Sequence, residues 1–149
     1  MRKTKLYFVA LAATLIQPCC AALGESVASV ETDRVRMNAS IRHTAAARYT
    51  VHHLESPPAL TVREYVSPGG IVFAVGWNGM VKPDLRQLLG SHFEAFVAET
   101  ARGPHAGRAV VYVTRPEVVI ESTGHMRSFV GRAFVPAEVP DGVSPADIH

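Results

Sequence analysis

The sequence predicts an α+β domain: an antiparallel sheet of about six strands in the order βββ-α-βββ, with one amphipathic helix packed on it. Two observations predict this fold. Six short runs rich in β-forming residues are separated by brief breaks, and connections this short favour antiparallel neighbours. Between the third and fourth runs, apolar residues recur at helical spacing from Pro83 onward. The strands are expected to form either one sheet or two packed sheets.

Residues 1–22 have the pattern of an export signal. Basic residues at positions 2, 3 and 5 precede an apolar run over residues 6–16, which is too short to span a bilayer. Small residues follow, so we expect cleavage after Ala21 or Ala22. The mature protein is then expected in the periplasm or outside the cell, with no transmembrane span.

A lipoprotein is the alternative, because Cys19 and Cys20 lie near the expected cleavage position. Pro18 is a poor fit before a lipid-modified cysteine. Both cysteines of the chain lie in this segment, so the cleaved domain has no disulfide and depends on its core. Without the three basic residues of the signal, 12 Lys and Arg remain against 13 Asp and Glu. That balance indicates neither a nucleic-acid partner nor an acidic membrane partner.

Residues 23–47 form a polar, alanine-rich lead-in. Ser29 fits the cap of a short helix that extends to Asn38, and a mobile connection fits the composition equally well. A single globular domain is expected over residues 48–149. Its last part, residues 136–149, is expected to be an irregular tail because it contains three prolines and a glycine.

The first three strands are expected over residues 48–54, 60–66 and 71–77. Pro68 and Gly69 predict a type II turn before the third strand, with a positive φ at Gly69. The third strand is apolar on both faces, so it is expected at the centre of the sheet. Strict alternation places the third strand's large residues on one face: Ile71, Phe73, Val75 and Trp77.

The helix is expected to begin near Pro83, because Pro suits the first helical position and Asp84 complements the helix dipole. An apolar stripe is expected to pack on the face of the third strand that carries Trp77. The last three strands are expected over residues 109–114, 117–121 and 125–135. The stripe comprises Leu85, Leu88, Leu89, His92, Phe93, Phe96 and Val97.

No pattern of catalytic or metal-binding residues is present. Seven histidines occur without metal-ligand spacing, and the adjacent His52 and His53 point to opposite faces of a strand. A hydrolase nucleophile motif is absent, and the carboxylates are spread over different elements. The sequence therefore predicts no catalytic residue, no metal and no cofactor.

The densest group of cation-capable side chains lies in the last strand: His125, Arg127 and Arg132. Arginine can bind a carboxylate or phosphate through two parallel hydrogen bonds, so these three residues are the candidate ligand-binding site. The alternative is an edge strand guarded by charge, whose arginines pair with Glu64, Glu117 or Glu121.

The expected function is that of a non-catalytic envelope or secretion accessory domain that binds an envelope protein or an anionic ligand. Its oligomeric state is not predicted. A second hypothesis is an enzyme that acts on a cell-wall or small anionic substrate through His125 and a carboxylate such as Glu64. A third is a purely structural surface protein.

Four segments resemble the family of exported bacterial proteins catalogued as domain of unknown function 2844: TVREYVSPGGIVFAVGW, PDLRQLLGSHF, GHMRSFVGRAFVP and GVSPADI. The resemblance extends from about Tyr49 to the end of the chain, apart from the loop around Gly103. It implies a signal peptide and one small exported domain, and it brings no activity, cofactor or catalytic residue. Cys19 and Cys20 depart from the alanines that are more usual there, which affects processing alone.

The intact mass of the exported protein should correspond to a chain that starts at Ala22 or Leu23 and contains no thiol, because the small residues before these positions fit signal cleavage. Mass spectrometry of the exported form measures this directly. A mass that includes diacylglycerol on Cys19 or Cys20 would contradict the expectation and would tether the domain to a membrane.

Overall fold

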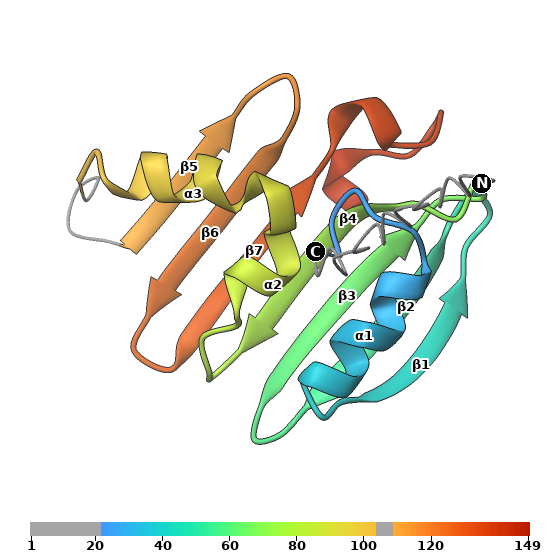
Figure 1. Cartoon of the computed structure of the whole chain (residues 1–149), viewed down its shortest axis with the longest axis horizontal. Coiled ribbons are helices and arrows are strands. Elements are labelled where there is room, and N and C mark those ends of the chain that lie inside the picture. Colours follow the sequence, from blue (N-terminus) through green and yellow to red (C-terminus); the bar gives the residue numbers. More distant parts are fainter. Residues whose placement is uncertain (1–21, 104–108) are drawn as a thin grey trace, which may run out of the picture.

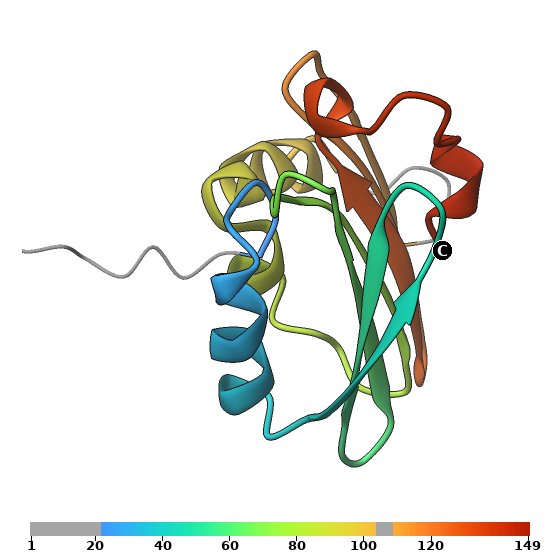
Figure 2. The same ribbon diagram turned by 90° about the vertical axis from the view of Figure 1, so that its right-hand side faces the viewer.

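The computed structural model describes residues 22–103 and 109–149. In these ranges, seven strands form one antiparallel sheet in the order β1-β2-β3-β4-β7-β6-β5 (Figure 1). Three α-helices lie on one face of the sheet and the C-terminal tail lies on the other (Figure 2). The strands are Ser40–Ala45 (β1), Thr50–Ser56 (β2), Leu60–Val66 (β3), Val72–Gly79 (β4), Ala109–Thr114 (β5), Val119–His125 (β6) and Ser128–Phe134 (β7).

The predicted α+β class is confirmed, and the sheet is single. Strands β1 to β4 form a meander, and the helical segment after β4 carries the chain to the far edge, where β5 begins. The chain then returns through β6 to β7, which pairs with β4 and joins the two groups of strands. The expected export signal lies almost entirely in residues 1–21, outside the described residues.

The described chain has one strand more than expected, because β1 lies in the segment interpreted as a lead-in. None of the β1 side chains is buried, and only Ile41 is half-buried, so the strand has no apolar face that its sequence could show. The same segment also contains α1, Ala28–Arg36. Of the two alternatives for this segment, the short helix is therefore the one that forms.

The turn between β3 and β4 differs in type from the prediction. The N–H of Gly70 donates to the carbonyl of Ser67 at 2.9 Å, and the N–H of Ser67 donates to the carbonyl of Ile71 at 2.9 Å. Gly70, rather than Gly69, has the positive φ, +78°. A three-residue hairpin loop that ends in a left-handed glycine has this geometry, and its twist suits the flanking strands.

Phe73 lies on the opposite face of the sheet from the one predicted. Tyr65 pairs with Ala74 while its neighbour Val66 pairs with Val72, so Phe73 is an extra residue in β4 and the alternation breaks there. Its ring packs against Tyr65 and Tyr49 on the tail face, at centroid distances of 6.2 and 5.9 Å. A bulge that depends on the partner strand cannot be seen in the alternation of β4 alone.

The predicted helix is broken at Gly90. Asp84 caps α2 (Leu85–Leu89) by accepting hydrogen bonds from two backbone N–H groups, those of Arg86 and Gln87 at 3.0 and 3.1 Å. Gly90 has φ +51° and ends α2, and a 3₁₀ turn, Gly90–His92, leads into α3, Phe93–Thr100. The break lets α2 cover the centre of the sheet while α3 lies over β5 and β6 (Figure 1).

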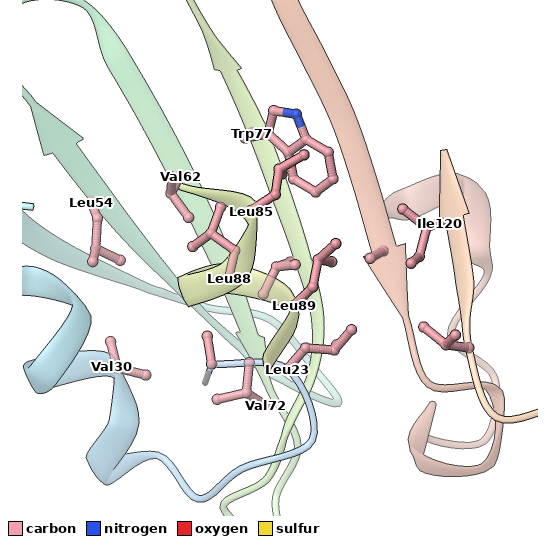
Figure 3. Close-up of a cluster of buried hydrophobic side chains, with 14 of the residues drawn as sticks. Leu23, Val30, Leu54, Val62, Val72, Trp77, Leu85, Leu88, Leu89 and Ile120 are labelled. Carbon is pink, nitrogen blue, oxygen red and sulfur yellow. The ribbon is translucent and has the colours of Figure 1, made fainter. Parts of the chain in front are cut away.

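The main core lies between the helices and the sheet. Leu85, Leu88 and Leu89 of α2 pack among the inward side chains of β3 and β4 (Figure 3). The chain before α1 also enters this core: Leu23 is 1% exposed, and its N–H donates to the carbonyl of Leu88 at 3.2 Å. The first described residues are therefore an integral part of the domain.

The tail is held on the other face by two arginines and a tyrosine. Nη1 of Arg132 donates to the carbonyls of Pro145 and Ile148 at 2.7 and 3.0 Å. Nη1 of Arg63 and the hydroxyl of Tyr65 donate to the backbone oxygen of His149 at 2.8 and 3.0 Å. Ile148 is fully buried in the smaller core of this face. These contacts fix the tail over the centre of the sheet.

A buried pair of carboxyl groups joins α1 to the sheet. Asp33 on α1 and Glu64 on β3 are 1% and 0% exposed, and Nε2 of Gln87 donates to Oδ1 of Asp33 at 2.7 Å. Among the described residues, no N–H or O–H group donates a hydrogen bond to either Glu64 oxygen or to Oδ2 of Asp33. A proton held by Glu64 can therefore form a hydrogen bond between the two carboxyl groups. Desolvation, followed by the charge and hydrogen bond of Asp33, raises the pKa of Glu64 to about 9.

Replacement of Leu89 by Ala should lower the free energy of unfolding by about 2–5 kcal/mol, because Leu89 is fully buried between α2 and the sheet and a cavity would remain. Val97→Ala is the matched control, since Val97 is 41% exposed on α3 and should change stability little. Chemical denaturation measures both variants. An unchanged midpoint for Leu89→Ala would mean that α2 does not pack on the sheet.

The stability of the domain should include a term that decreases as pH rises from about 4.5 to 9. The ordinary pKa of Glu64 is 4.5 and its folded pKa is about 9, so the folded chain keeps a proton that the unfolded chain has released. One such proton contributes a slope of at most about 1.4 kcal/mol per pH unit. Glu64→Gln should reduce this slope and stabilise the domain above neutral pH, because an amide stays neutral and still donates to Asp33.

Denaturation midpoints across this pH range test the carboxyl pair. Glu55→Gln, on the exposed side of β2, is the control and should leave the slope unchanged. If Glu64→Gln also kept the wild-type slope, Glu64 would not hold the proton assigned to it.

Candidate functional site

A pocket of about 440 Å³ opens on the helix face of the sheet, between α3, the loop before α2 and the β6–β7 hairpin. We call it the helix-side pocket. Its apolar walls are Trp77, Pro83, Leu85, Phe96, Val111 and Phe129. Its remaining side chains come from Lys82, Thr100, Ser122, His125 and Met126, with Gly124 in the hairpin. A cavity of this size and polarity is typical of small-molecule sites.

Trp77 forms the inner wall of the helix-side pocket. It pairs with Gly131 across β4 and β7, and a Cβ at Gly131 would clash with the indole. The absence of a side chain at Gly131 therefore lets the ring lie against the backbone of β7. Trp77 is 1% exposed and packs near Leu85 (Figure 3), so the wall is rigid and recessed.

The mouth of the pocket carries cation-capable groups. Lys82 lines it from the loop after β4, and His125 lines it from the end of β6. Arg127 does not line the pocket itself but belongs to the same β6–β7 hairpin as His125, and its Nη2 is 4.0 Å from Sδ of Met80 in the loop after β4. Within residues 22–103 and 109–149, these three side chains form no ion pair, so no carboxylate there competes with a ligand for them.

Arg127 occupies a backbone conformation that costs energy. Its φ is +59°, in the left-handed region, where a side chain loses roughly 1–2 kcal/mol relative to the right-handed region. Glycine adopts this conformation without that cost. The hairpin therefore carries a guanidinium group at a position where local backbone geometry favours glycine.

Exposed apolar side chains surround the same mouth. Met126 at the tip of the hairpin is 86% exposed, and Met80 and Val81 in the neighbouring loop are 47% and 40% exposed. The pairing of Gly79 with Phe129 holds this loop next to the hairpin. Cation-capable and apolar groups are thus combined at one end of the sheet.

A second cavity, of about 410 Å³, lies on the opposite face beside the tail, and we call it the tail-face groove. Arg132 lines it and is fully engaged there: besides the two tail carbonyls, Nε and Nη2 donate to the carboxylate of Glu121 at 2.9 and 3.1 Å. The other lining side chains include Arg63, Asn78, Tyr112, Thr123 and Val130.

The three residues singled out in the sequence are therefore not brought together. His125 and Arg127 share the β6–β7 hairpin at the helix-side pocket, whereas Arg132 lies on the tail face. The Arg132–Glu121 pair is one of the pairings that the alternative interpretation named. Sequence reasoning missed Lys82 and Trp77 as site residues, because they reach the hairpin only through the pairing of β4 with β7.

The structure does not assemble the catalytic pair of the enzyme hypothesis. Glu64 lies on β3, which is separated from His125 on β6 by the two strands β4 and β7, and Glu64 is fully buried with Asp33. Substrate cannot reach either carboxyl group. Among the described residues that line the helix-side pocket, none is a carboxylate that could act with His125.

Two other histidines face each other on the outer strands. Nδ1 of His43 on β1 lies 2.9 Å from Nδ1 of His52 on β2, and burial is the largest cause that lowers the pKa of His52. His43 is the cross-strand neighbour of His52, a pairing that was not predicted from the sequence. No cluster of three or more potential metal ligands occurs within residues 22–103 and 109–149.

Across the part of the chain that the structure describes, no helix combines the length and the apolar character that a membrane crossing requires. No curated protein and no solved structure matches this chain. A family model described as "Protein of unknown function (DUF2844)" matches residues 19–148, a range that contains every helix and strand of the sheet domain. The resemblance found in the four sequence segments is thereby confirmed, and the chain belongs to the DUF2844 family.

Proposed function

We propose that this chain is an exported, non-catalytic accessory domain of the cell envelope or of secretion, and that it binds an anionic ligand at the helix-side pocket. One observation carries the proposal: Lys82 and His125 are the ionisable side chains among the pocket's described lining, and Arg127 adds a guanidinium group at its mouth. Nearby positive charge without acidic lining favours a negatively charged ligand.

The absence of a carboxylate beside His125 supports binding rather than catalysis. The enzyme hypothesis pairs His125 with a carboxylate, and no carboxylate lines this pocket among the described residues. Asp33 and Glu64 form the buried carboxyl pair in which the pKa of Glu64 is raised, and neither residue lines this pocket. The pocket offers apolar contact and positive charge, which suffice for holding a ligand.

Export is supported by the basic and apolar pattern of residues 1–22 and by the lack of cysteine after Cys20. A domain that is stable without thiols or disulfides is insensitive to the redox state of its compartment. The proposed location is the periplasm or the outside of the cell.

Arg132 has a different role in this proposal from the one expected. Its side chain donates hydrogen bonds to Glu121 and to two tail carbonyls, so its removal would release the tail and leave Glu121 unpaired. A test of binding must keep Arg132 in place.

The double variant His125→Ala, Arg127→Gly tests the proposal. Gly removes the cation and also relieves the left-handed strain at residue 127, so the variant should be as stable as the wild type. Native mass spectrometry of protein purified from envelope extract should show a bound anionic species on the wild type that is lost from the variant.

Arg42→Ala, Arg115→Ala is the matched control for charge, because both arginines are outside the pocket and pair with exposed carboxylates. This control should retain the bound species. Equal retention by the folded His125→Ala, Arg127→Gly variant would remove the hairpin from consideration as the binding site.

A further inference from the structure

We propose that the ligand of the helix-side pocket is a long-chain fatty acid, with its alkyl chain inside the pocket and its carboxylate at Lys82 and Arg127. This inference rests on the proposed function and specifies the chemical class of its ligand. Four features of the pocket support this assignment: its walls, its charge, its rim and its depth.

The walls favour an alkyl chain. Trp77, Leu85, Phe96 and Phe129 offer ring and methyl surfaces, and the polar lining is confined to a few hydroxyl and cationic groups. Water in such a pocket has few hydrogen-bond partners, so an apolar chain that displaces it gains free energy. The volume of about 440 Å³ lies within the range of roughly 300–1,000 Å³ found for small-molecule sites.

The charge favours a carboxylate at the mouth. Lys82 is exposed and belongs to the lining. Arg127 of the hairpin approaches the loop that carries Lys82, because its Nη2 lies 4.0 Å from Sδ of Met80 in that loop. A carboxylate between them would form charge-assisted hydrogen bonds, and a guanidinium group can bind its two oxygens together. A neutral amphiphile would leave both cations without a partner.

The rim can adapt to a chain. Met80 and Met126 are exposed and unbranched, and methionine packs against irregular apolar shapes because it has three rotatable bonds and a polarizable sulfur. Exposed apolar groups gathered at a pocket mouth are typical of a binding surface. Val81, also exposed, extends this surface along the loop before α2.

The depth of the pocket favours a single extracted chain over a bilayer surface. Trp77 and Leu85 are 1% and 6% exposed although they line the pocket, so a flat lipid surface cannot touch them. A flexible alkyl chain that has left the membrane can enter the pocket and contact Phe96 and Phe129, which line it and are only half-buried. The occupant is thus one fatty acid molecule for each domain.

Fluorescence of Trp77 provides the test, because it is the one tryptophan in the sequence and forms the inner wall of the pocket. Dibromostearate, added below its micelle concentration to the mature protein, should quench this fluorescence with a saturable curve, since bromine quenches indole at short range. Unbrominated stearate should reverse the quenching. Butanoate, which has the same head group and a short chain, and octadecanol, which has the same chain and no charge, should each compete at least about tenfold more weakly.

Two pairs of variants locate the ligand. Lys82→Ala, Arg127→Gly should weaken dibromostearate binding about tenfold or more, and Arg42→Ala, Arg115→Ala should leave it unchanged. Ser122→Phe fills the helix-side pocket and should abolish quenching. Thr123→Phe adds the same ring to the next residue of β6, which lines the tail-face groove, and should leave quenching intact. Circular dichroism identifies any variant that fails to fold, and the charge variants then decide alone.

The outcomes separate the two proposals. If butanoate competes as well as stearate, an anion binds and the proposed function stands, but the fatty-acid inference is overturned. If octadecanol competes as well as stearate, or if the charge variant binds normally, the head-group assignment is wrong. Quenching by brominated phospholipid vesicles without quenching by monomeric dibromostearate would indicate a membrane surface instead. An absence of binding by every probe would overturn the fatty-acid inference, whereas loss of the proposed function requires that native mass spectrometry also shows no bound anionic species.

Discussion

The packing of the Trp77 indole against Gly131 is the contact on which the rest of the structure depends. It lies where β4 meets β7, which is the pairing that joins the two groups of strands into one sheet. The ring contributes to the main core on the helix face and also borders both cavities. The indole fits only because residue 131 has no side chain. The same contact therefore determines the position of the ring, the pairing of β4 with β7 and the shape of the cavities.

The two faces of the sheet use their charges in different ways. On the tail face, Arg132 and Arg63 direct their donors to Glu121 and to backbone carbonyls, so these cations complete the fold. On the helix face, Lys82 and Arg127 are exposed and make no ion pair within the described residues. The cationic side chains on the two faces thus form two groups: Arg63 and Arg132 stabilise the fold, and Lys82 and Arg127 can bind a ligand.

Much of the sheet could be predicted, because β2, β3 and β4 are runs of β-forming residues bounded by Pro and Gly. The strand β1 could not, since its side chains are exposed and only backbone pairing with β2 defines it. The face of Phe73 depends on a bulge relative to β3, and the break at Gly90 depends on how α2 and α3 each meet the sheet. In each case the deciding interaction is with a distant segment.

The candidate site shows the same limit. His125 and Arg127 could be grouped because one hairpin carries both, and their residue types indicate an anionic ligand. Lys82 and Trp77 join them through strand pairing across about 50 residues of sequence, which no local pattern records. The assignment of Arg132 to the opposite face follows from simple alternation along β7, but its pairing with Glu121 requires the register of β6.

The docking of the tail has a consequence for the order of events in folding. Tyr65 and His149 share two hydrogen bonds although they are 84 residues apart. The strand β4 pairs with β7, which follows β5 and β6 in the chain. Contacts of such sequence separation form slowly, because loop closure must precede them. A nascent chain that lacks residues 145–149 leaves Arg132 and Arg63 without their carbonyl acceptors, so it remains incompletely closed.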